Sequence, residues 1–195
     1  MQRRYERPRR ALSWEDVQRL LRAVDRSSPR GLRDYAILLM MSVYGFGAGE
    51  IIRLQFQDID WDAGTLSVCR PKTGRVHAAA VAAGCRALAH YLRHGRPADT
   101  PTRHLFVPLK MPLEAFVGSS AIRHIVVKHA KIAGIDAPFL GSHVLRHSHA
   151  ARQIDLGARP QVVSELLGHR DPESVSAYVR IATETLREIA LPVPT

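Results

Sequence analysis

Four side chains in the C-terminal half of the chain could together carry out phosphoryl-transfer chemistry. His143 and Arg146 are three residues apart, so on a helix they share a face. His169 follows the helix-ending Gly168, and Tyr178 lies nine residues further on. A guanidinium binds phosphate oxygens, imidazoles donate hydrogen bonds or move protons, and a phenol can attack phosphorus. This set predicts metal-free phosphodiester chemistry.

The charge of the chain indicates a polyanionic partner. Lysine and arginine number 28 against 18 aspartates and glutamates, which gives a formal net charge of +10. Most of the basic residues are arginines, which grip phosphate through two parallel N–H bonds. Nucleic acid is therefore the expected partner. A GC-rich coding bias toward arginine and alanine is the alternative explanation for this composition.

Length and composition predict one globular domain. The 195 residues are 46% hydrophobic and 24% charged, which suits a single domain with a proper core. The sequence lacks an apolar run near the ~20 residues that cross a bilayer, and its arginine-rich start does not resemble a signal peptide. Two cysteines, Cys69 and Cys85, cannot build a disulfide framework or a four-thiolate zinc site. A cytoplasmic location is expected.

Apolar spacing and turn residues predict a mainly helical α+β fold. Residues 1–11 are expected to form a disordered basic tail, and Ser13 to cap the first helix. Further helices are expected over Leu32–Tyr44, Glu50–Leu54, Cys85–His94, Ser119–Ala133, His143–Leu156, Pro160–Leu167 and Pro172–Val179. Strands around residues 66–68 and 75–81 form an antiparallel hairpin with Lys72 at its tip, and residues 96–118 form a long loop.

Several motifs together resemble the tyrosine recombinase (phage integrase) family, relatives of the type IB topoisomerases. The C-terminal pattern is His-x-Leu-Arg-His, then Leu-Gly-His, then the tyrosine nine residues later. Residues 45–51 resemble the family's Gly-Leu-Arg-x-x-Glu-Leu box, with Glu50 at the acidic position. Lys72 stands where the family keeps a hairpin lysine. The resemblance covers residues 12–190 and implies the fold of the DNA breaking-rejoining enzymes.

The resemblance also implies a role for each of these residues. Tyr178 would attack duplex DNA, form a 3′-phosphotyrosine and release a 5′-hydroxyl. Lys72 would protonate that leaving oxygen, and Glu50 would orient the basic residues. The residues around the phosphate would be Arg146, His143 and His169. The covalent bond conserves the phosphodiester energy, so the implied strand exchange needs no cofactor and no metal.

Domain organisation and partners follow from the same resemblance. Residues 12–191 would form the catalytic domain, with no N-terminal core-binding domain in this chain. The implied partners are duplex DNA and, on DNA, a tetrameric synapse, with a monomer off DNA and no membrane. The segment Thr183–Ala190 would dock on a neighbouring protomer.

One position departs from the family pattern: Gly47 stands where the family places its first catalytic arginine. Losing one preorganised donor to a developing oxyanion typically costs about 10²–10³ in rate. Another arginine could compensate, the enzyme could be slow, or the domain could bind DNA without cutting it. Arg53 is the nearest candidate, but six positions on a continuous helix put it about 120° from residue 47.

Other interpretations of these residues remain open at the level of sequence. A silent DNA-binding module is suggested by the glycine at position 47, and a metal-dependent nuclease by the histidine cluster. A zinc site could begin with His143, His147 and His169, although Arg146 would put a positive charge beside the metal. His147 and His149 are expected to pack as structural residues. The glycines at 45, 47 and 49 lack the spacing of a nucleotide-binding loop.

Overall fold

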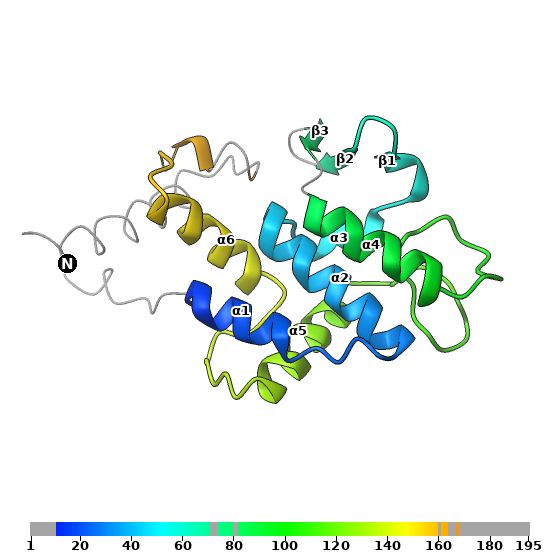
Figure 1. Cartoon of the computed structure of the whole chain (residues 1–195), viewed down its shortest axis with the longest axis horizontal. Helices are drawn as coiled ribbons and strands as arrows, with labels where there is room; N and C mark the ends of the chain where they lie inside the picture. The colour runs from blue at the N-terminus through cyan, green and yellow to red at the C-terminus, as the bar shows by residue number, and fades with distance from the viewer. Residues whose placement is uncertain (1–10, 71–73, 80–81, 160, 164–166, 168–195) are drawn as a thin grey trace, which may run out of the picture.

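Helix α2 (Pro29–Tyr44) runs through the middle of the fold, and other helices pack around it (Figure 1). The computed structural model describes residues 11–70, 74–79, 82–159, 161–163 and 167. The other elements of this part of the chain are α1 (Trp14–Arg22), α3 (Ala48–Arg53), the 3-10 helix η1 (Phe56–Asp58), β1 (Ile59–Asp60), β2 (Thr65–Arg70), β3 (Gly74–Ala79), α4 (Ala82–His94), α5 (Ser120–Ile132) and α6 (Val144–Asp155). Helix α2 contacts α1, α3, α4 and α6. It therefore connects the two halves of the sequence.

The sequence of α2 explains its central position. Ser28 caps the helix by accepting a hydrogen bond from Gly31 N at 3.1 Å, and Pro29 occupies the first turn, where no N–H partner is needed. Residues 36–42 are all buried, so the helix is covered on every side in its second half. The predicted helix Leu32–Tyr44 is confirmed, one turn longer at its start.

Gly45 ends α2 in the left-handed conformation, with φ of +65°. A Cβ at this position would stand 2.6 Å from Leu167 Cδ2 and 2.7 Å from His149 Cδ2. Glycine is therefore required both by the backbone angle and by the close approach of α6 and of residue 167.

Helix α1 begins as predicted and is tied to α6. Ser13 Oγ accepts a hydrogen bond from Asp16 N at 3.0 Å, which confirms the expected cap. Val17 and Leu20 are fully buried one turn apart on the inner face. Just before the helix, Leu12 N donates to Ser148 Oγ at 2.8 Å. This buried bond fixes the start of the described chain against the middle of α6.

A small antiparallel sheet in the order β1-β2-β3 lies at one edge of the helical body (Figure 1). The pairing of β2 with β3 runs from Thr65 opposite Ala79 to Arg70 opposite Gly74. The expected hairpin is therefore confirmed, although Lys72 lies outside the described residues. The helices expected near Glu50, Cys85, Ser119 and His143 are also present, within a few residues of their predicted ends.

Residues 95–119 link α4 to α5 as a long loop. Among the described residues, this stretch forms no helix or strand apart from an isolated β-bridge between His104 and Gln55, which confirms the expected loop. Residues 161–163 are helical, in line with part of the predicted helix Pro160–Leu167, whereas Pro172–Val179 lies outside the described residues. Among the described helices, none combines the length and apolarity that crossing a bilayer requires.

A buried ionic cluster that the sequence did not predict joins α2, α5 and the long loop. Asp34, 1% exposed, accepts hydrogen bonds from Arg33 Nη2 at 2.8 Å and from His129 Nε2 at 3.0 Å. Arg33 Nη1 donates in turn to Val107 O at 3.1 Å. Because a buried charge needs compensation, this carboxylate fixes the position of α5 relative to α2.

The cluster predicts how the free energy of unfolding depends on pH. Burial alone would raise the pKa of Asp34, but the hydrogen bond from His129 and the charge and hydrogen bonds of Arg33 outweigh it and hold the pKa below its ordinary value. Asp34 therefore contributes fully to the free energy of unfolding above about pH 4. That contribution is lost as the pH falls through the lowered pKa of Asp34.

We expect Asp34→Asn to reduce the free energy of unfolding at pH 7 by about 3–5 kcal/mol, because it leaves the buried Arg33 charge uncompensated. The variant should also lose less stability than the wild type below pH 4. Urea denaturation across pH measures both effects. Asp136→Asn, at an exposed position, is the matched control and should stay close to the wild type. Equal losses in the two variants would contradict a stabilising role for the cluster.

Candidate functional site

The guanidinium of Arg146 is held by acceptors from three parts of the chain. Nη1 donates to Gly45 O at 3.0 Å and to Glu50 Oε2 at 2.8 Å, and Nη2 donates to Leu167 O. The residue is only 8% exposed. Arg146 therefore joins α6 to the turn between α2 and α3 and to the segment that follows α6.

Glu50 holds both this guanidinium and the start of α3. Its Oε2 accepts a hydrogen bond from Gly47 N at 2.7 Å, as a residue in the first turn does when it caps its own helix. The same oxygen accepts from Arg146, and Glu50 is 8% exposed. The structure thus brings together Arg146 and Glu50, which lie 96 positions apart in the sequence and which the family resemblance selected.

The hydrogen-bond pattern leaves part of the guanidinium available. Arginine has five N–H groups, and the three acceptors described above use three of them. Within the described part of the chain, the Nε–H and one Nη2–H of Arg146 have no acceptor. A rigid guanidinium with two spare donors is suited to bind a phosphate oxygen.

His143 stands at the start of α6, one turn before Arg146, and its side chain is exposed. It lines an open groove of about 490 Å³, which we call the His143 groove. The residues that give the groove its character are Arg123, Phe139, Ser142, His143 and His147. The rings of His143 and His147 are 6.5 Å apart between centroids. The groove therefore combines an arginine and two histidines with an apolar surface, and its His143 stands one turn before Arg146.

The two histidines expected to be structural differ from each other. His149 is 5% exposed, and its Nδ1 lies 3.0 Å from Ser42 O, so it packs inward as predicted. Burial lowers the pKa of His149, and the positive charge of Arg146 lowers it further, while the bond to Ser42 opposes the shift. This histidine is therefore kept neutral. His147 is less buried than His149 and lines the groove.

The position of the missing arginine lies directly against the Arg146–Glu50 pair. A Cβ at Gly47 would stand 3.4 Å from Arg146 Nη1 and 3.8 Å from Glu50 Oε2. The backbone there, with φ of −79° and ψ of 159°, allows any side chain. Arg53, the nearest alternative arginine, is exposed, and its guanidinium lies against Gly49, 3.4 Å from where a Cβ would stand.

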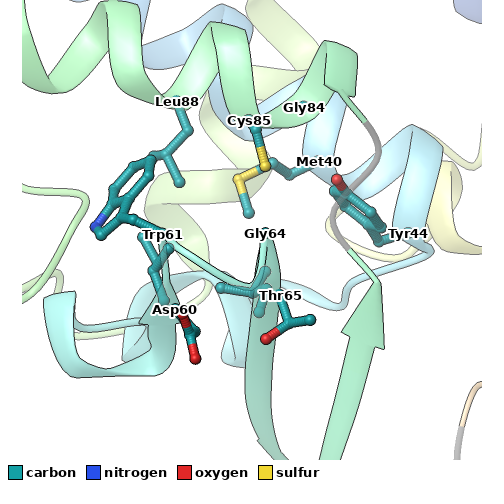
Figure 2. A pocket seen from close by; sticks show the side chains of 11 residues that line it. Met40, Tyr44, Asp60, Trp61, Gly64, Thr65, Gly84, Cys85 and Leu88 are labelled. Atoms are coloured by element: carbon teal, nitrogen blue, oxygen red, sulfur yellow. The ribbon is translucent and has the colours of Figure 1, made fainter.

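A second pocket lies between α2, α4 and the sheet and has a volume of about 110 Å³. Figure 2 shows the side chains that line it. The rings of Trp61 and Tyr44 stand on opposite sides of it, with the sulfur atoms of Met40 and Cys85 between them. The Asp60 carboxylate accepts hydrogen bonds from two backbone N–H groups of the following turn. This pocket is apolar and offers no acid–base pair, so the groove beside Arg146 is the better candidate site.

Three of the selected residues, Lys72, His169 and Tyr178, lie outside the described residues. Among the residues that are described, no three His, Cys, Asp or Glu side chains gather as a metal site would require. Arg123 is the groove residue that the sequence analysis missed. No sequence motif includes Arg123, and an exposed arginine on a helix is usually just a solvated surface residue.

Comparison with known proteins identifies the class. Residues 10–185 match the phage integrase family, and the chain belongs to that family. This confirms the resemblance drawn from the motifs.

Individual relatives agree with this assignment. The chain is 38% identical over 185 residues to y4rA of Sinorhizobium fredii, a protein described as an integrase/recombinase, and spans 95% of its own length but 45% of that protein. It is similar in structure to the XerA recombinase, with a TM-score of 0.76 and 26% identity over 92% of this chain and 63% of that one. It also shares its fold with the XerH recombinase bound to a DNA substrate, with a TM-score of 0.77 and 18% identity over 92% and 52% of the two chains.

The Arg146–Glu50 pair predicts a strong coupling in stability. We expect Arg146→Gln alone to reduce the free energy of unfolding by about 3–5 kcal/mol, because it removes the cationic partner of a buried ion pair. Adding Glu50→Gln should cost less than the sum of the two single changes, with a coupling energy of about 1–3 kcal/mol. Urea denaturation of the four proteins completes the cycle. Lys131→Gln, an exposed change on α5, should leave stability almost unaltered, and additive losses at 50 and 146 would refute the coupling.

Proposed function

We propose that this chain breaks and rejoins duplex DNA as a site-specific recombinase or integrase. The observation that carries the proposal is the buried Arg146 guanidinium, which Glu50 fixes and which stands one helical turn from the exposed His143. Among the described residues, two of its donors have no acceptor. Membership of the phage integrase family supports it.

In the proposed reaction, the Tyr178 oxygen attacks the scissile phosphorus and the bond from phosphorus to the 5′ oxygen breaks. Lys72 gives a proton to that oxygen, and an imidazole of His143 or His169 accepts the phenolic proton. Arg146 binds a non-bridging oxygen while negative charge develops on it. Attack by the 5′-hydroxyl of another strand reverses these steps and restores the phosphodiester bond.

The proposed partners and setting follow from this reaction. Duplex DNA is the substrate, a tetramer assembles on paired DNA sites, and the protein is a monomer away from DNA. Residues 183–190 dock on the neighbouring protomer, and the reaction takes place in the cytoplasm. The XerH structure, which was determined with a DNA substrate, supports the DNA partner.

A second candidate function is a DNA-binding module that does not cut. The glycine at position 47 favours it, because the place for the family's first catalytic arginine lies against Arg146 and holds no side chain. The two candidates differ in one measurable product, the covalent bond between protein and DNA.

We expect the wild-type chain to form a covalent adduct with DNA in the presence of EDTA, and Tyr178→Phe to form none. The probe is a pool of nicked duplexes with random sequence around the nick, which traps the adduct because the released end diffuses away. Denaturing electrophoresis separates the adduct from free protein. Retarded migration in a native gel without any adduct would support the binding module, and cutting that EDTA abolishes would support a metal-dependent nuclease.

We further expect Gly47→Arg to increase the rate of adduct formation by about 10²-fold or more, because it adds a donor where the developing charge lacks one. A Cβ at residue 47 would meet its neighbours at ordinary contact distances, so the first atom of the new side chain fits. Gly47→Gln, of similar length but uncharged, is the matched control and should give a much smaller gain. An equal rate in wild type and Gly47→Arg would show that residue 47 does not limit cleavage in this chain.

A further inference from the structure

We propose that the His143 groove binds the DNA phosphate next to the scissile one, with Arg123 as its principal cation. This inference rests on the proposed function and extends it, because it assigns a strand-positioning role to a residue outside the motifs. It concerns binding of the DNA backbone, and not the chemical step.

The composition of the groove favours an anionic ligand. Its basic side chains come from two separate helices: Arg123 belongs to α5, His147 belongs to α6, and His143 is the N-cap residue of α6. Among the described residues, those that line the groove include no aspartate or glutamate. Ser142 adds a hydroxyl that can donate a hydrogen bond. The Arg123 guanidinium, with imidazole and hydroxyl groups beside it and no carboxylate in the described lining, attracts a phosphate.

The size of the groove suits part of a nucleotide chain. Its volume of about 490 Å³ lies within the range of sites that hold whole small molecules and far exceeds the space of one ion. Phe139 is half-buried and Val144 is buried, so they provide an apolar surface beneath the basic side chains. A sugar–phosphate unit has the matching combination of a charged group and an apolar face.

The position of the groove connects it to the proposed chemistry. His143 belongs to both, since it lines the groove and stands one turn from Arg146 on α6. Because His143 is one turn from Arg146, we expect a strand whose scissile phosphate lies on Arg146 to continue along the groove. Contacts to the backbone fix the register of a protein on DNA without reading its sequence. Arg123 is therefore a positioning residue for any duplex.

The first test measures binding as a function of salt. Each phosphate contact releases counterions, so losing one contact flattens the dependence of log K on log salt by about one unit. We expect Arg123→Gln to show this change, together with several-fold weaker binding to a fluorescent mixed-sequence duplex in anisotropy titrations. Lys131→Gln removes the same charge from an exposed position on the same helix and should keep the wild-type slope. Equal slopes for the two variants would overturn the proposal.

The second test locates the contact. NMR titration with the dinucleotide dTpT should shift the ring signals of His143 and His147 in the wild type and not in Arg123→Gln. The neutral methylphosphonate analogue of dTpT should leave both signals unchanged, because it lacks the phosphate charge. Equal shifts with both probes would mean that the groove binds the base or sugar, which also overturns the proposal. Both tests measure binding only, so a failure to form the covalent adduct would count against the proposed function and not against this groove.

Discussion

The ion pair between Arg146 and Glu50 is the constraint on which the candidate site depends. Removing both charges from water is costly. Hydrogen bonds offset that cost, because the guanidinium donates three of them and one carboxylate oxygen accepts two. The acceptors belong to the end of α2, the start of α3 and the segment after α6, so one side chain sets the relative positions of all three. The same pair forms one wall of the space at Gly47. A change at either partner therefore alters local geometry and the charge offered to a phosphate together.

Much of the fold could be predicted from the sequence because its signals are local. The Ser13 cap, the apolar run of α2 and the paired strands each depend on residues a few positions apart, and each appears as expected. The resemblance to a family added what local patterns cannot provide, namely the expectation that Glu50 orients Arg146. The structure brings these two residues into contact. The placement of Lys72, His169 and Tyr178 stays a prediction.

The features that the sequence did not reveal depend on distant contacts between ordinary residues. Asp34 meets His129 across 95 positions, and neither residue belongs to a recognisable motif. His147 was expected to pack as a structural residue, and the structure places it half-buried in the lining of the groove. Arg123 becomes a candidate binding residue only because it lines the same groove as His143 and His147. Helical periodicity gives the buried face of one helix, whereas a groove is defined by two elements and the angle between them.

The bond from Leu12 N to Ser148 Oγ links the leading segment mechanically to the helix that carries Arg146. The Ser148 hydroxyl also donates to Val144 O at 2.9 Å, so it grips the same turn of α6 that holds the guanidinium. Tension applied to the polypeptide ahead of residue 12 would act on that turn through this bond and on the core through the buried Leu12 side chain. A load on that segment, such as the pull of a tethered bead, would therefore disturb the helix that carries Arg146.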